Sequence, residues 1–246
     1  MSRARRRRST PPPGGRSVLA GVLSLLGELL ITLGLVLGLF VAYSLWWTNV
    51  LADRQASARA DEVRRQWQRQ QPPGGAPRQA EPGALDTQDG IGFLHVPAMD
   101  NGEVLVKPGT SPEVLNDGVA GYYTEPVKAA LPWEEKGNFT LAAHRDGHGA
   151  KFHDIDKVKN GDAVVFETRD TWYVYKVFAE LRQTSKYDVD VINPVPKESG
   201  RTAPGRYITL TTCTPVYTSK YRYVVWGELV RTEKVDARRT PPAELR

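Results

Sequence analysis

A long apolar segment near the amino terminus is the feature that most limits how this chain can fold. From Leu29 to Trp47, nineteen residues pass without a charged side chain. At 1.5 Å of rise per residue, a helix of that length is roughly 28 Å long, close to the hydrocarbon thickness of a bilayer. The apolar character begins at Val18 and is interrupted only by Glu28, a carboxylate that would be costly at mid-bilayer. We therefore expect residues 18–47 to form a membrane anchor, with Glu28 near its cytoplasmic edge or facing a partner.

The residues that flank this segment predict its orientation. Residues 1–16 contain six arginines and no acidic residue, and such a flank stays in the cytoplasm. Tyr43, Trp46 and Trp47 would then lie at the outer interface. We expect a single-pass protein of the cell membrane with a cytoplasmic amino terminus and an extracytoplasmic main part. A cleaved secretory signal ending near Ala56-Ser57-Ala58 is the alternative, but its apolar core would be only about 7–15 residues long.

The net charge of +5 does not indicate a nucleic-acid-binding domain. Of the 33 basic and 28 acidic residues, the six arginines of the amino-terminal arm and Glu28 precede residue 48. The remaining 27 basic and 27 acidic residues cancel, so the basic character belongs to the arm that flanks the membrane. We therefore expect the membrane as a partner and no nucleic acid.

Composition divides the chain into five parts. The segment after the anchor combines helix formers with a Pro- and Gly-rich run from Gln71, which predicts a short stalk helix followed by a flexible spacer. The carboxy-terminal residues indicate a frayed tail. The parts are a basic cytoplasmic arm (1–17), the anchor (18–47), the stalk and linker (48–90), one folded domain (91–232) and the tail (233–246).

The folded domain has the pattern of short β-strands separated by turn residues. The run 168–171 links two such segments as a hairpin, and 111–115 is the one helical stretch, with Ser111 as its N-cap. This pattern predicts an all-β barrel or sandwich with short helices. The expected strands are 91–96, 104–106, 139–143, 163–168, 172–178, 207–212 and 221–229.

Cys213 is the only cysteine, so it cannot form an internal disulfide. In an extracytoplasmic protein a lone thiol indicates nucleophilic chemistry. A thiol attacks carbonyl carbon as the thiolate, and a neighbouring imidazole commonly supplies that state. His144 is the preferred partner because it directly follows the apolar run 139–143, whereas His95 lies inside a strand-like run and is interpreted as structural.

A metal site is the alternative use of the histidines. His144, His148 and His153 could bind zinc with Asp146 or Asp154 as a fourth ligand. The glycines on both sides of His148 disfavour the helix that would place its ring beside that of His144. The sequence therefore favours no metal and no other cofactor.

Arg222 is the candidate for stabilising the oxyanion or orienting a substrate. The loop 214–220 can return the chain so that Arg222 and Cys213 face one another on antiparallel strands. A fixed guanidinium there would stabilise a tetrahedral intermediate. A solvated strand arginine is the alternative.

Together these residues resemble the sortases, the membrane-anchored cysteine transpeptidases of Gram-positive bacteria. The similarity covers about 91–230 and rests on Thr209-Leu210-Thr211-Thr212-Cys213, on Leu141-Ala142-Ala143-His144-Arg145 and on Arg222 nine residues after the cysteine. Thr214-Pro215 and the run 222–227 are most similar to class E sortases of actinobacteria, although Ala143 stands where many members have glycine. The resemblance implies an eight-stranded closed β-barrel.

The resemblance also implies the reaction and its partners. Cys213 would attack the Thr–Gly carbonyl of a C-terminal sorting signal on a secreted protein, of the Leu-Ala-x-Thr-Gly or Leu-Pro-x-Thr-Gly type. His144 would protonate the departing amine, and a peptidoglycan precursor amine would resolve the thioester. Tyr122 and Thr212 are the expected substrate contacts. A catalytically silent peptide- or wall-binding barrel and a cysteine hydrolase without transfer are the alternatives.

Overall fold

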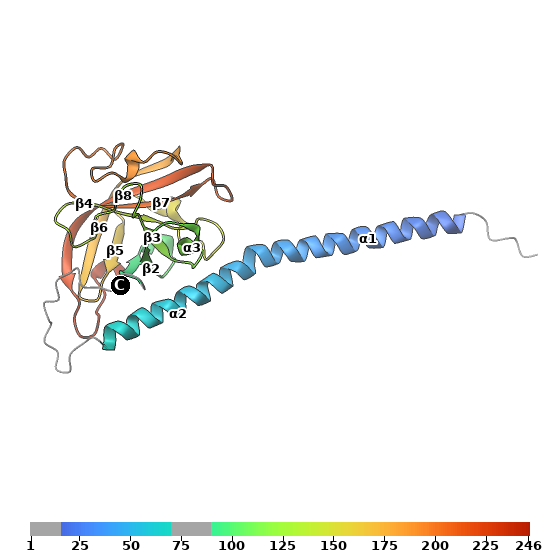
Figure 1. Cartoon of the computed structure of the whole chain (residues 1–246), viewed down its shortest axis with the longest axis horizontal. Coiled ribbons are helices and arrows are strands. Elements are labelled where there is room, and N and C mark those ends of the chain that lie inside the picture. The colour runs from blue at the N-terminus through green and yellow to red at the C-terminus, as the bar shows by residue number, and fades with distance from the viewer. Residues whose placement is uncertain (1–15, 70–89) are drawn as a thin grey trace, which may run out of the picture. The chain divides into compact units, whose positions relative to one another are not determined.

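The computed structural model of the protein describes residues 16–69 and 90–246 (Figure 1). Most of the predicted cytoplasmic arm and of the Pro/Gly-rich linker lies outside the described residues. The chain divides into two compact units, residues 1–45 and 46–246, and each is described by itself.

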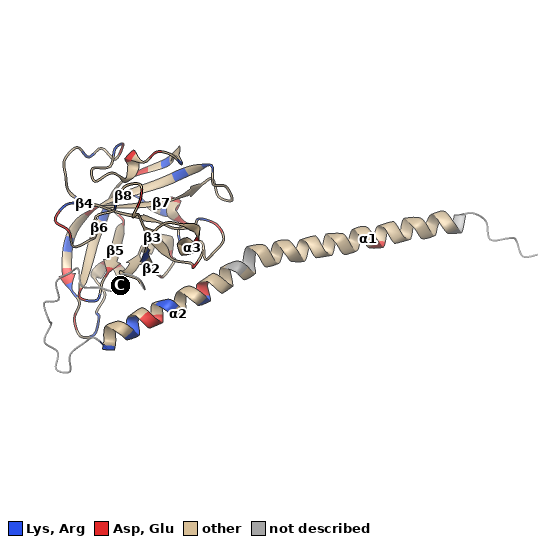
Figure 2. Ribbon diagram, viewed as in Figure 1, with Lys and Arg blue, Asp and Glu red and all other residues tan. Residues whose placement is uncertain are grey.

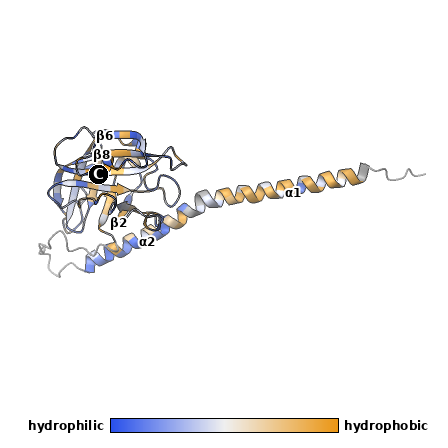
Figure 3. Ribbon diagram, turned by 45° about the horizontal axis from the view of Figure 1, so that its top comes forward, coloured by the Kyte–Doolittle hydropathy of each residue, from blue (hydrophilic) through white to orange (hydrophobic). Residues whose placement is uncertain are grey.

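The first unit is the helix α1 (Arg16–Ala42), whose stretch Val18–Ala42 is long and apolar enough to cross a membrane. Figures 2 and 3 show its apolar surface and the acidic residue within it. This apolar stretch begins at Val18, as expected from the sequence, and it includes Glu28. The position of Glu28, near the cytoplasmic edge or facing a partner, stays a prediction. Residues 18–27 are apolar as well, and one carboxylate does not end the helix. The π-helical segment η1 (Tyr43–Trp47) follows α1 directly.

The second unit is built around a closed β-barrel of eight strands, which confirms the predicted fold class. Around the barrel the strands follow the order β1-β2-β3-β4-β7-β8-β6-β5, and β2–β3 and β4–β7 are the parallel neighbours. The strands are β1 (Gly92–His95), β2 (Glu103–Pro108), β3 (Ala120–Tyr122), β4 (Gly137–Ala142), β5 (Ala163–Glu167), β6 (Thr171–Ser185), β7 (Arg206–Thr214) and β8 (Tyr221–Lys234). The helical elements of this unit are α2 (Thr48–Arg69), α3 (Pro112–Leu115) and the 3-10 turns η2 (Pro97–Met99), η3 (Ile155–Lys157), η4 (Asp190–Ile192) and η5 (Ala243–Leu245).

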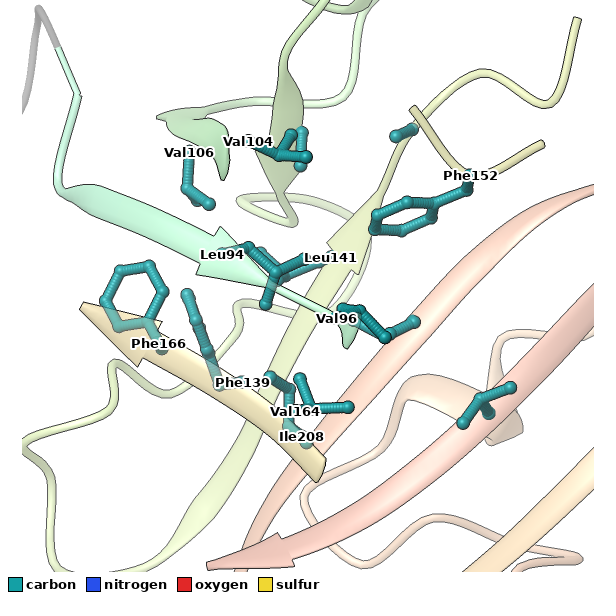
Figure 4. Packing of buried hydrophobic residues seen from close by; sticks show 14 of the residues in the cluster. Leu94, Val96, Val104, Val106, Phe139, Leu141, Phe152, Val164, Phe166 and Ile208 are labelled. Atoms are coloured by element: carbon teal, nitrogen blue, oxygen red, sulfur yellow. The ribbon is translucent and has the colours of Figure 1, made fainter. Parts of the chain in front are cut away.

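Alternation along the strands places one apolar set inside the barrel. Figure 4 shows Leu94, Phe139, Leu141, Phe166 and Ile208 meeting there from β1, β4, β5 and β7. Each of these side chains is at most 1% exposed. Because successive strand residues point to opposite faces, the residues between them are directed to the outer face of the barrel.

The hairpin expected at residues 168–171 is confirmed by the β5–β6 pairing. β3 was not among the expected strands, since three residues are too few for an alternating pattern. The expected frayed tail is wrong at two points. β8 continues to Lys234 opposite Thr171, and beyond it Glu244 is paired with Arg231 at 2.6 Å.

The helix α2 differs from the stalk expected at this place, because one of its faces is buried in the second unit. Ala60, Val63 and Trp67 recur at helical spacing and pack with Phe93 and Leu105 from the outer faces of β1 and β2. Trp67 meets Phe93 edge-on, with 5.3 Å between the ring centroids. The small and apolar residues of this helix therefore serve docking, which their spacing alone did not reveal.

A buried carboxylate joins α2, the barrel and the carboxy-terminal segment. Glu167 ends β5, and its side chain is 2% exposed. It accepts hydrogen bonds from Arg64 of α2 and from Arg239, and it lies 3.0 Å from Nε2 of His95. Burial raises the pKa of this carboxyl, but the hydrogen bonds from His95, Arg64 and Arg239 outweigh it and hold the pKa at about 2. His95 therefore has the structural role expected of it.

We predict that Glu167→Gln lowers the free energy of unfolding by about 3 kcal/mol at neutral pH, because Arg64 and Arg239 lose their buried counter-charge. The folded-state pKa lies below the unfolded value near 4.5, so the carboxylate stabilises the fold above pH 4.5. This contribution is lost as the pH falls through about 2. Urea unfolding of the unit beginning at Trp46 measures the difference. Glu62→Gln, in an exposed ion pair, is the control and should change stability far less than Glu167→Gln does. Equal losses in the two variants would contradict the prediction.

Candidate active site

Cys213 lies near the end of β7 on the outer face of the barrel. Ile208 and Leu210 of the same strand belong to the interior cluster, so Thr209, Thr211 and Cys213 share the opposite face. The cysteine is a free thiol and is partly exposed. A nucleophile placed in this way is accessible from outside the barrel, while its strand position is held by the pairing with β8.

The antiparallel pairing of β7 with β8 places Arg222 directly opposite Cys213. This confirms the pairing expected from the loop 214–220. Side chains of directly opposed residues project to the same face, with Cβ atoms about 4.5–5.5 Å apart. Nη1 of Arg222 donates to the backbone carbonyls of Ser219 (3.3 Å) and Tyr221 (3.0 Å). Within the described residues the structure shows no further hydrogen bond from this guanidinium.

β4 is the neighbour of β7 on the side opposite β8, and it pairs with β7 in parallel. Ala142 pairs with Thr211, and the backbone of Ala143 continues the contact, since its N–H donates to the Thr211 carbonyl at 3.4 Å. β4 ends at Ala142, so His144 lies two residues beyond the last β4–β7 pair, as Cys213 lies two residues beyond Thr211 on β7. The end of β4 therefore leads into the loop that carries His144 beside the end of β7, where Cys213 lies opposite Arg222 of β8.

The imidazole of His144 is half-buried and lies among polar neighbours. Its Nε2 is 2.8 Å from Oδ1 of Asn116, which follows α3. The ring of His148 lies 5.3 Å away, centroid to centroid. Burial lowers the pKa of His144, the charge of His148 lowers it further, and Asp146 opposes both.

The other histidines of this loop do not support the zinc alternative. His153 uses Nδ1 to donate to the carbonyl of Arg145 at 2.8 Å, and Asp154 is paired with Lys157. Among the described residues, one group of three possible ligands converges, and it lies elsewhere: His95, Glu103 and Glu167. The guanidinium of Arg64 is already bound to both of those carboxylates, and its charge opposes a cation there.

The two predicted substrate contacts are in different positions from those expected. Thr212 is 3% exposed, and its hydroxyl donates to the Ala143 carbonyl at 2.7 Å, so it holds β7 against the end of β4. Tyr122 is 8% exposed and packs in the barrel interior. The next residue, Tyr123, points to the face of the candidate site, and its hydroxyl lies 3.1 Å from Oγ1 of Thr211. Tyr123, rather than the predicted Tyr122, therefore has its hydroxyl on the strand face that Thr211 shares with Cys213.

Sequence reasoning missed Arg145, although it directly follows His144. Its side chain is 5% exposed and spans three partners: the His153 carbonyl at 3.2 Å, Oγ1 of Thr214 at 3.0 Å and Asp156 at 2.9 Å. The bond to Thr214 ties the loop after His144 to the strand that carries Cys213. The position of Arg145 directly after His144 could have pointed to it, but the sequence pattern does not show that its side chain is buried.

The first turns of α2 also contact this loop. Asn49 accepts a hydrogen bond from the backbone N–H of Gly149 at 3.1 Å, and Asp53 pairs with Lys151 at 2.7 Å. A Cβ atom on Gly118 would lie 3.0 Å from the carbonyl oxygen of Ala52, so glycine permits this close approach. The first turns of α2 therefore contact both the loop that follows His144 and Gly118, two residues after Asn116.

Comparison with known proteins identifies the family. The sortase domain model matches residues 94–230. Sortase SrtE2 of Streptomyces coelicolor is 67% identical over 230 residues, which cover 93% of this chain and 90% of that protein. The chain belongs to the sortase family. It is a sortase enzyme, a transpeptidase similar to the class E sortases of Streptomyces.

Solved sortase structures agree with this assignment. Sortase E1 from Streptomyces coelicolor, crystallised with a tripeptide in its active site, is 45% identical with a TM-score of 0.60, and the match covers 65% of this chain and 97% of that one. Sortase E from Streptomyces avermitilis is 36% identical with a TM-score of 0.56, over 64% of this chain and 97% of that one. The barrel of this sortase is therefore the family's fold.

We predict that Thr212→Val lowers the free energy of unfolding by about 1–2 kcal/mol, because the buried Ala143 carbonyl loses a hydrogen bond. Valine keeps the shape of threonine, so the loss of stability measures the contribution of the hydroxyl group. The Michaelis constant for a signal peptide should stay within about twofold of wild type. Thr232→Val, at an exposed position of β8, is the control and should leave stability unchanged. Unfolding curves and steady-state kinetics decide the question. A raised Michaelis constant without a loss of stability would restore Thr212 as a substrate contact.

Proposed function

We propose that this sortase joins secreted proteins to the cell wall. It would cleave a C-terminal sorting signal between Thr and Gly and transfer the acyl group to a peptidoglycan amine. The observation that supports the proposal is the pairing of Cys213 with Arg222 on β7 and β8, together with the β4–β7 register, which ends two residues before His144 and Cys213. A nucleophile, a proton donor and a cation on one outer face are the groups that acyl transfer requires.

The mechanism consists of two acyl transfers through a thioester. The Cys213 thiolate attacks the Thr carbonyl carbon, and Arg222 stabilises the negative charge that develops on the carbonyl oxygen. The C–N bond breaks, and His144 gives its proton to the departing glycine amine. An acceptor amine then attacks the thioester and loses a proton to His144, and the thiolate leaves. The tripeptide in the active site of the similar Sortase E1 supports a peptide substrate for this chain as well.

The membrane span supports the same proposal. α1 would hold the enzyme at the membrane, with the arginine-rich arm in the cytoplasm and the barrel outside. Both substrates of such a reaction, a translocated protein and a wall precursor, are found on that side. A hydrolase without transfer would use the same three residues, so the acceptor step must be tested directly.

We predict that a Leu-Ala-x-Thr-Gly peptide forms a thioester on Cys213 and that an added amine resolves it into a transfer product. Intact-protein mass spectrometry should show the adduct in wild type and no adduct in Cys213→Ala. His144→Ala should lower turnover by about 100-fold or more. Arg222→Lys should be nearly as harmful as Arg222→Ala, because an ammonium does not reproduce the guanidinium fork.

His153→Ala is the matched control for His144 and should change turnover only slightly. A fully active Cys213→Ala variant would exclude the thiol mechanism and favour the silent binding barrel. Hydrolysis at an unchanged rate, with no transfer to any of several amines, would favour the hydrolase.

We predict that His148→Gln raises the pKa of His144, since the charge of His148 is one of the two effects that lower it. Burial remains, so the pKa should stay below its ordinary value. The limb of the pH–rate profile that reports His144 should move to higher pH, with little change in turnover at neutral pH. Histidine NMR titration and kcat/KM measured against pH test this. His153→Gln should leave the limb in place, and a shift to lower pH in His148→Gln would contradict the proposed coupling.

Specificity for the second residue of the signal is expected to depend on Tyr123 rather than Tyr122. An alanine at that position leaves room for a large side chain of the enzyme, which is consistent with the Leu-Ala-x-Thr-Gly preference that the class E resemblance implies. Wild type should favour the alanine peptide over the proline peptide, and Tyr123→Ala should reduce this preference. Tyr187→Ala, at a tyrosine that is 79% exposed, is the control. Equal rates on both peptides with wild type would refute both the preference and the role of Tyr123.

A further inference from the structure

We infer that Asn116 is a positioning residue for His144. It fixes the imidazole with its proton on Nε2, so that Nδ1 is the nitrogen that exchanges a proton with Cys213 and the amines. This inference rests on the proposed role of His144 and adds a residue that neither the sequence pattern nor that proposal includes. The observation that carries it is the 2.8 Å contact between His144 Nε2 and Asn116 Oδ1.

The chemistry of the contact determines which ring nitrogen carries the proton. An amide oxygen only accepts hydrogen bonds, so the Nε2 of His144 must be the donor. A neutral imidazole has one N–H, and with that proton on Nε2 the lone pair lies on Nδ1. When His144 is protonated, the additional proton is therefore held on Nδ1 and is the one given to the departing amine.

The backbone around Asn116 holds this amide in place. Its N–H donates to the carbonyl of Pro112 at 2.9 Å and so closes the turn of α3. The next residue, Asp117, pairs with Arg59 of α2 and lies 3.4 Å from Nζ of Lys107 in β2. The helix end is thus tied to α2 and to the barrel, while the Asn116 side chain extends to His144. The turn of α3 is closed by the backbone N–H of Asn116, so the helix does not need the side-chain amide of this residue.

An amide also differs from a carboxylate in its effect on charge. A carboxylate at this position would stabilise the imidazolium and raise the pKa of His144. The groups whose charges shift the pKa of His144 are His148 and Asp146 from its own loop, the proposed site adds Cys213 from β7 and Arg222 from β8, and the uncharged Asn116 contacts the ring from the end of α3. Asn116 therefore orients the ring without adding charge.

Three variants of the full chain in detergent test the inference: Asn116→Ala, Asn116→Asp and the control Asn160→Ala, which removes an amide from an exposed turn. The chain has four histidines, so selective ¹⁵N labelling and histidine-to-alanine assignment resolve each ring. Long-range ¹H–¹⁵N spectra report the tautomer. Turnover, the Michaelis constant and the pH profile are measured with a Leu-Ala-x-Thr-Gly peptide.

We expect wild type and Asn160→Ala to hold neutral His144 as the Nε2–H tautomer. Asn116→Ala should show both tautomers, and its kcat should fall about 10- to 100-fold with little change in KM. Asn116→Asp keeps the acceptor, so it should retain the Nε2–H tautomer, recover part of the lost kcat and move the His144 limb to higher pH.

An Nδ1–H tautomer in wild type would overturn the inference, as would Asn116→Ala with wild-type tautomer and kcat. If Asn116→Ala unfolds, two measurements still test the inference: the tautomer of His144 in wild type, and the shift of the His144 limb of the pH–rate profile in Asn116→Asp. Failure of the proposed function is recognised separately, because His144→Ala and Cys213→Ala would then remain active whatever tautomer the spectra show.

Discussion

The register of three strands, β4, β7 and β8, is the constraint on which the candidate site depends. A slip of one residue would turn every side chain of a strand to the other face, so Cys213 would enter the barrel core. Buried hydrogen bonds oppose such a slip between β4 and β7. Thr209 donates to Asn138 at 2.8 Å, and the hydroxyls of Thr211 and Thr212 donate to the carbonyls of Leu141 and Ala143. The threonines before the cysteine therefore have a physical role: they fix the register of β7 against β4 up to the residues that directly precede Cys213 and His144.

The second unit extends beyond the barrel, because α2 and the carboxy-terminal segment are fastened to it by charge. The buried carboxylate of Glu167 binds arginines from both segments, and an isolated arginine or glutamate at this depth would be unfavourable. The opposite end of α2 contacts the loop after His144 through Asn49 and Asp53. The two ends of α2 are therefore attached to different parts of the second unit, one to Glu167 of β5 and the other to the loop after His144.

Much of the fold could be predicted from local pattern, and the failures share a cause. The hairpin at 168–171 and the opposition of Cys213 to Arg222 followed from turn residues and loop length, which act over a few positions. The docking of α2, the order of the tail and the short strand β3 depend on partners far away in the sequence, such as Glu167, and no local pattern contains them. The burial of Tyr122 inside the barrel is a further example, since three strand residues do not show which face is buried.

The surroundings of His144 explain why an uncharged partner suits its proposed role. The departing amine requires a proton, so the imidazolium is the active form in the first step, and burial together with His148 reduces its population at neutral pH. The same effects make the imidazolium a stronger acid, which favours proton transfer once the ring is charged, and they leave the neutral ring free to accept the proton of the incoming amine. A carboxylate in place of Asn116 would increase the population of the acid and weaken it as a donor. The amide instead controls orientation alone, so the pKa of His144 is left to burial, His148 and Asp146, while the geometry is set by α3.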